Sequence, residues 1–198
     1  MIAEVADGKV RCDWSYGDPL LLEYHDREWG VPLRDDKRLF EMLILEGAQA
    51  GLSWLTVLKK RENYRKVFDH FDPEKISHYN EKKVAGILQN EQIIRNRLKV
   101  NATVLNAKKY LEVKKEFGSF DDYIWSFARN KKPMDNNWKS LRQIPATSRE
   151  SDAMSADLKK RGFKFVGSTI CYAFMQAVGM VNDHQTMCFR YMEILKTR

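Results

Sequence analysis

The stretch Leu45–Leu55, LEGAQAGLSWL, decides how the centre of this 198-residue chain folds. The helix that ends in this stretch begins some residues before it. Helical spacing predicts one continuous stripe along that helix, made of Leu39, Met42, Leu43, Glu46 and Ala50. Gly51 ends this helix, and the Ser53 hydroxyl is suited to cap the next helix, which we expect to reach about Phe68. The stretch therefore predicts two consecutive helices joined by a short turn.

Glu46 interrupts the apolar side of the first of these helices. An unpaired buried carboxylate costs several kcal/mol or shifts its pKa, so it needs a partner or a function. One interpretation is an ion pair with one of the many Arg or Lys residues, or a stripe that is one residue out of register. The other is a clamp for a flat, positively charged ligand, formed by the carboxylate and the Trp54 indole. Nearby aromatic residues fit either interpretation, since aromatic side chains are usually core: Trp14, Tyr24 and Trp29.

Helical patterns account for most of the remaining chain, and no strictly alternating strand pattern occurs. Caps and glycines predict a short helix from Asp72 and longer helices over about 18–29, 80–89, 93–116, 120–128, 151–161 and 167–178. The polar segment 130–148 reads as a connector or loop. These elements predict an all-α chain that forms a single domain over residues 1–198, with two lobes at about 35–130 and at 1–34 plus 150–198.

Charge and composition narrow the classes of partner and compartment. The formal net charge is +7, which favours a phosphate-bearing partner, although many basic proteins bind no nucleic acid. The uncharged run Phe165–Val181 is just too short and too polar to cross a membrane, and it predicts a buried helix. Met1–Val10 lacks the apolar stretch of a signal peptide, and three dispersed cysteines do not make a disulfide framework. We therefore expect a cytoplasmic protein with no membrane association.

Two cysteines stand near two histidines at opposite ends of the chain. The spacings Cys-x12-His and His-x3-Cys supply four donors of the kind that Zn²⁺ binds, namely Cys12, His25, His184 and Cys188. Four protein donors leave no open coordination position, so such a zinc site would be structural. The alternative is that these residues are unrelated, with both cysteines simply buried. His70 and His78 lie in a polar stretch and are expected at the surface.

Four longer segments are similar to a known family: Arg11–Trp14, Asp18–Pro32, Leu45–Arg65 and Lys159–His184. They resemble the bacterial DNA-3-methyladenine glycosylase I family, over nearly the whole chain from Cys12 to Cys188. The resemblance implies a helix–hairpin–helix glycosylase fold and a zinc-stapled lobe made by the two chain ends, with the four ligands named above. It also implies base recognition by the catalytic residue Glu46, stacking by Trp54 and a hydrogen bond from Tyr24. Trp14 and Trp29 match aromatic residues around the same pocket.

The resemblance also implies where DNA is bound. The hairpin should lie around Asn90–Arg95, where family members usually have Gly in place of Gln92, and glycine would ease a turn with positive φ. Arg95, Arg97 and Lys99 are expected to contact the DNA backbone, and Leu52 to act as a wedge in the duplex. Leu21 and Ala173 stand where some relatives have polar residues, which could change details of the pocket.

Taken together, the resemblance implies a monomeric enzyme that hydrolyses the N-glycosidic bond of 3-methyladenine in alkylated double-stranded DNA. No Schiff-base lysine is evident, so a monofunctional enzyme without lyase activity is expected. The alternatives are a non-enzymatic, zinc-stapled reader of damaged DNA bases and a helical interaction protein stabilised by a metal. The intact set of Glu46, Tyr24 and Trp54 favours the enzyme, because neither alternative needs it.

Overall fold

Side-chain caps determine where most of the helices begin. In the computed structural model, which describes residues 7–196, Asp18, Asp35 and Ser53 accept hydrogen bonds from the first turns of the next three helices. The α-helices are α1 (Pro19–Arg27), α2 (Asp36–Gln49), α3 (Trp54–Val67), α4 (Pro73–Ser77), α5 (Glu81–Leu88), α6 (Arg97–Phe117), α7 (Phe120–Trp125), α8 (Arg149–Lys160), α9 (Ser168–Ala177) and α10 (Phe189–Lys196). Part of Met1–Val10, on which the expectation about a signal peptide rests, lies outside the described residues.

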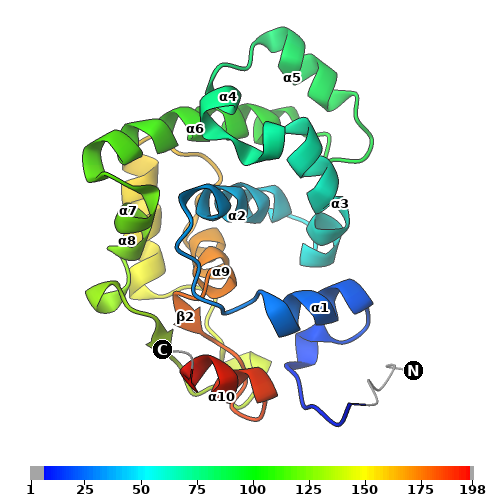
Figure 1. The fold of residues 1–198 in the computed structure, drawn as a ribbon, viewed down its shortest axis with the longest axis vertical. Helices are drawn as coiled ribbons and strands as arrows, with labels where there is room; N and C mark the ends of the chain where they lie inside the picture. The colour runs from blue at the N-terminus through cyan, green and yellow to red at the C-terminus, as the bar shows by residue number, and fades with distance from the viewer. Residues whose placement is uncertain (1–6, 197–198) are drawn as a thin grey trace.

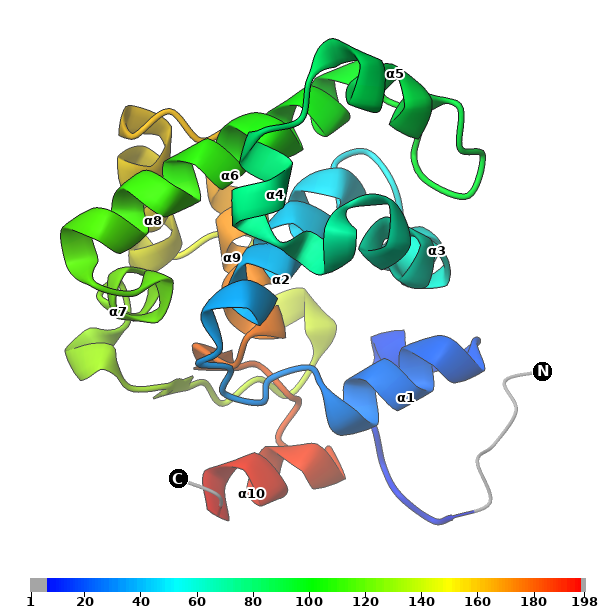
Figure 2. The same ribbon diagram turned by 45° about the horizontal axis from the view of Figure 1, so that its top comes forward.

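Helix α2 forms the centre of the molecule, as the apolar stripe predicts. Leu39, Phe40 and Leu45 are fully buried in it. Helix α9 packs along one side of α2, while α6 with α4 covers another, and α3 returns beside it (Figures 1 and 2). One hydrophobic core joins these helices, so residues 150–178 share their core with residues 35–130.

The structure departs from the expected elements in three places. Helix α6 begins at Arg97, four residues after the expected start at Ile93, because Asn96 caps it and the buried Ile93 belongs to the preceding turn. The connector contains β1 (Met134–Asp135), which pairs in parallel with β2 (Val181–Asn182), so the chain is mostly helical rather than all-α. Helix α10 was not expected from the sequence. Short 3-10 helices complete the chain: η1 (Asp13–Ser15), η2 (Asp69–Phe71), η3 (Arg129–Lys131) and η4 (Leu141–Gln143).

The first and last described α-helices, α1 and α10, lie in the same half of the molecule (Figure 1), and Phe189 N at the start of α10 donates to the carbonyl oxygen of Val10. The backbone between α1 and α2 is tied to the end of α9 by hydrogen bonds from Gly30 N to Gln176 O and from Leu33 N to Val178 O. Gly179 permits this contact, since its φ is +69° and a Cβ there would lie 2.4 Å from the carbonyl carbon of Val31. The N-terminal segment is thereby held against the end of α9.

We expect Gly179→Ala to lower the free energy of unfolding by about 3 kcal/mol, because the added methyl group collides with backbone atoms that have no room to move. Urea denaturation measures this loss. Gly118→Ala is the control, since Gly118 also has positive φ but its Cβ would meet open space, and about 1 kcal/mol is expected there. Equal losses in the two variants would contradict a packing role for Gly179.

Within residues 7–196, none of the helices is both long and apolar enough to cross a membrane.

Candidate functional site

A cavity of about 330 Å³ opens between α1, α2, α3, α9 and the connector. Its walls combine aromatic, apolar and polar side chains: Trp14, Tyr24, Trp29, Glu46, Gln49, Trp54, Leu141, Ile144, Ala173 and Gln176. A neighbouring hollow of about 200 Å³ shares Glu46, Gln49 and Ala173 with it and continues to the Gly51–Leu52 turn and to Thr169–Ile170. All five residues predicted to bind a ligand therefore meet in one place.

Glu46 is the one acidic residue in the wall of this cavity. It is 4% exposed, and none of the described residues forms a hydrogen bond or ion pair with its carboxylate. Burial raises the pKa of Glu46 to about 8, because the charged form loses the solvation it would have in water. Glu46 is buried, as its place on the predicted stripe implies. The alternative, an ion pair with Arg or Lys, does not form among the described residues.

Aromatic rings surround this carboxylate. The Tyr24 and Trp54 ring centroids are 5.3 Å apart, and those of Trp14 and Trp29 are 4.9 Å apart. Burial, followed by the nearby Glu46, raises the pKa of Tyr24 well above its ordinary value, so its hydroxyl keeps its proton. The indole Nε1 of Trp54 has no hydrogen-bond partner among the described residues. The cavity thus offers flat aromatic faces beside a carboxylate that no protein group neutralises.

Ion pairs hold α1 over α3 and so place Tyr24 opposite Trp54. Arg61 of α3 makes a two-pronged contact with Glu28, with N–O distances of 2.7 and 2.8 Å. Lys59 of the same helix lies 2.9 Å from Asp18, the N-cap of α1.

The four predicted metal ligands meet in a second, fully buried group. The candidate donor atoms of Cys12, His25, His184 and Cys188 all lie within 4.8 Å of one another. Cys188 Sγ is 3.4 Å from His25 Nε2 and 3.6 Å from His184 Nδ1, and Cys12 Sγ is 3.5 Å from His184 Nδ1. This group could hold a metal ion, and it joins η1 and α1 to the segment before α10.

Each histidine has one ring nitrogen near the thiols, and its other ring nitrogen contacts an oxygen atom that fixes the orientation of the ring. His184 Nε2 lies 3.0 Å from the carbonyl oxygen of Trp29, and His25 Nδ1 lies 2.8 Å from Asp26. Because a carbonyl or carboxylate oxygen only accepts, these nitrogens carry the protons and the opposite nitrogens keep their lone pairs. Burial lowers the pKa of His184, which keeps this ring neutral. Arg11 in turn holds Asp26 through two-pronged contacts of 2.8 and 3.0 Å.

The residues predicted to contact DNA fall into two groups. Leu52 is 42% exposed at the tip of the turn between α2 and α3, beside the cavity. Arg95 and Arg97 are exposed near the start of α6. Lys99 instead points inward, and its ammonium group donates to the carbonyl oxygens of Ala48 and Ala50 at the end of α2. Lys99 therefore has a structural role at the turn that carries Leu52.

The turn between α5 and α6 forms without a glycine. Gln92 does not have positive φ, and its backbone N–H donates to the Asn90 side chain at 2.8 Å. The hydroxyl of Tyr64 accepts from Ile94 N at 3.3 Å and ties the turn to α3. Gln92 is thus accommodated by an ordinary side-chain turn rather than by a strained backbone.

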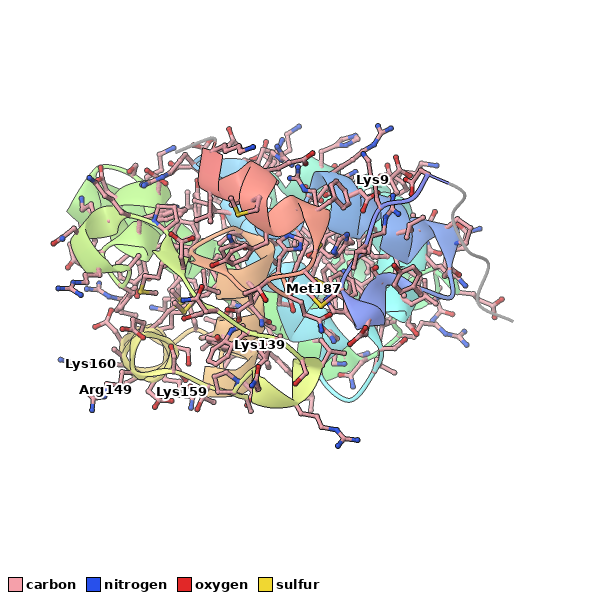
Figure 3. The ribbon with its side chains drawn as sticks, turned by 90° about the horizontal axis from the view of Figure 1, so that it is seen from below. Lys9, Lys139, Arg149, Lys159, Lys160 and Met187 are labelled. Atoms are coloured by element: carbon pink, nitrogen blue, oxygen red, sulfur yellow. The ribbon has the colours of Figure 1, made fainter. Side chains whose placement is uncertain are left out.

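Two further observations concern the surface. His70 and His78 are exposed, as predicted. Exposed cations of the connector and α8 gather on the side shown in Figure 3, namely Lys139, Arg149, Lys159 and Lys160. They fit the positive net charge of the chain.

Sequence reasoning missed four residues of the cavity wall, Gln49, Leu141, Ile144 and Gln176. Gln176 could have been found, because it is a polar residue inside the apolar run Phe174–Val178, the same signal that drew attention to Glu46. Leu141 and Ile144 carry no such signal, since only tertiary contacts bring the connector to the cavity.

Comparisons with known proteins agree on one group. The family described as methyladenine glycosylase matches residues 14–191. The chain is 53% identical over 181 residues to DNA-3-methyladenine glycosylase 1 of Escherichia coli K12, covering 91% of this chain and 96% of that protein. It is 49% identical to DNA-3-methyladenine glycosylase of Haemophilus influenzae, covering 90% and 96%.

Solved structures give the same result. A crystal structure of 3-methyladenine DNA glycosylase I superposes with a TM-score of 0.88 at 54% identity, covering 91% of this chain and 98% of that one. The Staphylococcus aureus 3-methyladenine DNA glycosylase I, studied for 3-methyladenine recognition, superposes with a TM-score of 0.87 at 37% identity, covering 90% and 95%.

Proposed function

Because the chain belongs to the methyladenine glycosylase family, we propose that it is a base-excision repair enzyme that hydrolyses the N-glycosidic bond of 3-methyladenine in alkylated double-stranded DNA. The observation that carries this proposal is the buried Glu46 carboxylate, unpaired in an aromatic cavity. A cation with N–H donors compensates such a carboxylate, and a neutral base does not.

The chemistry of the lesion explains why so few catalytic groups are needed. Adenine methylated at N3 is cationic while it is attached to its sugar, so the glycosidic bond is weak and the base leaves as a neutral molecule. Glu46 binds this cation, and the pKa of about 8 means that binding draws the carboxyl toward its charged form. Neutral adenine brings no positive charge that would favour the ionised form of Glu46, which discriminates against undamaged DNA.

The aromatic residues hold the base once it has left the duplex. Unstacking costs a few kcal/mol and is least for a damaged base. Trp54 stacks on the extruded ring, Tyr24 donates a hydrogen bond to it, and Trp14 with Trp29 closes the wall behind it. Water attacks the sugar, and the enzyme is monofunctional, without a lyase step.

DNA is bound by the surface around the cavity. Leu52, exposed at its turn, enters the duplex as a wedge, and Arg95 and Arg97 contact phosphates beside a helix–hairpin–helix made by α5 and α6. Lys99 acts here by holding the end of α2 rather than through a free charge. The protein works as a monomer, a single glycosylase domain of two lobes.

The metal group is a structural zinc site. Zinc bond lengths of about 2.3 Å to sulfur and about 2.05 Å to nitrogen place neighbouring tetrahedral donors about 3.6 Å apart. The S–N distances of 3.4–3.6 Å support this geometry. Four protein donors would leave no position for substrate, so a zinc ion bound here would hold η1, α1 and the segment before α10 together beside the cavity.

Release of base from methylated DNA tests the proposed activity. Incubation of N-methylated duplex DNA with the protein should liberate 3-methyladenine, measured by chromatography of the soluble fraction. Tight binding of the methylated duplex without release would instead identify a reader of damaged bases.

Trp54→Ala should weaken binding of free 3-methyladenine by about tenfold to a hundredfold, because stacking of one base on an aromatic ring contributes about 1–3 kcal/mol. Isothermal titration calorimetry measures the change in Kd. Trp54→Phe is the matched control and should keep most of the affinity. Unchanged binding by the alanine variant would remove Trp54 from base recognition.

A further inference from the structure

Asp183 is a buried carboxylate that no part of the proposed mechanism uses. It is 1% exposed, and its oxygens accept four hydrogen bonds from neutral donors. Oδ1 accepts from Asn136 Nδ2 at 2.6 Å and Trp138 Nε1 at 2.8 Å, both in the connector. Oδ2 accepts from the Tyr172 hydroxyl at 2.7 Å and Gln176 Nε2 at 2.8 Å, both on α9. Asp183 therefore joins the connector to a helix that lines the cavity.

The contact with Asp183 determines which way the Gln176 amide points. A carboxylate can only accept, so Gln176 must present its NH2 group to Asp183. Its carbonyl oxygen, Oε1, is then turned away from Asp183, and no described residue donates to it. Gln176 is also a wall residue of the cavity.

We propose that Asp183 is a positioning residue that fixes Gln176 with its carbonyl oxygen toward the cavity, so that the pocket selects purines with an exocyclic amino group over their 6-oxo counterparts. This inference rests on the proposed function and deepens it. An amino group donates to Oε1, whereas an oxo group would place two acceptors against each other and leave both without a proton.

Gln176 is needed for this selection because Glu46 cannot provide it alone. With a pKa of about 8, Glu46 exchanges a proton near neutral pH, and its protonated form can donate to an oxo group. The amide of Gln176 does not titrate, and its orientation is set by the hydrogen bond that it donates to Asp183. The two residues therefore divide the task, with Glu46 matching charge and Gln176 matching the amino group.

A single substitution at Asp183 should reverse the orientation of the Gln176 amide, because Trp138 determines how the new side chain is turned. In Asp183→Asn, the new side chain has one acceptor end and one donor end. The indole N–H of Trp138 can only donate, so the acceptor end must face the connector. The donor end then faces Tyr172 and Gln176, where it pairs with the Gln176 carbonyl and turns the Gln176 NH2 group toward the cavity.

Calorimetry with two free bases tests this proposal. 3-Methyladenine carries an amino group at position 6, and 3-methylhypoxanthine carries an oxo group there together with one ring N–H. We expect the wild-type protein to prefer the amino compound by at least about tenfold, and Asp183→Asn to reduce that ratio by about tenfold or more. The double variant Asp183→Asn with Gln176→Glu should restore the preference, since the introduced carboxylate again presents an acceptor to the cavity. Gln176→Met, which has similar volume and no hydrogen-bonding amide, should remove most of it.

Asn136→Ala is the matched control, because it removes a donor from the other oxygen of Asp183 and leaves the Gln176 contact in place. Its ratio should equal that of the wild type. Thermal unfolding and bound metal are measured for every variant. Equal weakening of both bases with an unchanged ratio in Asp183→Asn would show a purely structural role and overturn the proposal. If Asp183→Asn does not fold, an unchanged ratio in Gln176→Met overturns it. Failure of the wild-type protein to bind either base would instead count against the proposed function.

Discussion

Glu46→Gln is expected to reduce excision of 3-methyladenine by about 10²–10³-fold while making the folded protein more stable. The loss of activity follows from the cationic lesion, which a neutral amide no longer compensates in a cavity shielded from water. The gain in stability follows from burial, because the amide carries no charge to desolvate. Single-turnover excision rates on methylated duplex DNA measure the first effect.

The stability gain should depend on pH in a defined direction. The folded pKa of Glu46 is about 8 and its ordinary value is 4.5, so between these values the folded protein binds more protons than the unfolded chain. Stability of the wild-type protein therefore falls as pH rises from about 4.5 to about 8. Glu46→Gln should lack this pH dependence. Its free energy of unfolding should therefore exceed that of the wild type by an amount that grows with pH to a few kcal/mol, the order expected for the pKa shift of Glu46.

Glu41→Gln is the matched control for this experiment. Glu41 lies on the same helix and is buried, but it pairs with Arg65 at 2.7 Å and does not line the cavity. Its excision rate should stay near that of the wild type. Two results would contradict the role given to Glu46 in binding the cationic lesion. One is excision at the wild-type rate by Glu46→Gln, and the other is a pH profile of unfolding that runs parallel to that of the wild type.

Cys188→Ser should abolish stoichiometric metal binding and lower the free energy of unfolding by about 5 kcal/mol, because the proposed zinc ion would join the N-terminal and C-terminal segments. The wild-type protein should contain about one zinc per chain, measured by inductively coupled plasma mass spectrometry. Affinity for free 3-methyladenine should also fall, since the same segments carry Trp14, Tyr24 and Trp29 to the cavity.

The third cysteine supplies the control for the metal experiment. Cys171 is as buried as Cys188 but lies on α9, outside the metal group. Cys171→Ser should retain the full zinc content, whatever it costs in packing. Full metal content in Cys188→Ser, or equal loss in both variants, would contradict the ligand assignment.

Local sequence signals predicted most of the helices. Asp18, Ser53 and Asn80 cap helices that begin where expected, because a cap acts on backbone groups only two or three residues away. The start of α6 was misplaced, because the burial of Ile93 and the bond from Ile94 N to the Tyr64 hydroxyl depend on a distant helix. The short pairing of β1 with β2 was missed for the same reason, because it joins the connector to a segment that follows α9.

The sequence alone determined the chemical inventory, namely a carboxylate on an apolar stripe, aromatic residues near it, and two Cys–His pairs that could bind a metal. These patterns are periodic or closely spaced, so they can be read along the chain. Only the tertiary structure decided that Leu45–Leu55 forms one wall of a cavity, that Lys99 is taken up in holding its turn, and that Asp183 orients Gln176. The physical reason is that a hydrogen bond or wall formed between segments tens of residues apart depends on packing of the whole core, which no local pattern records.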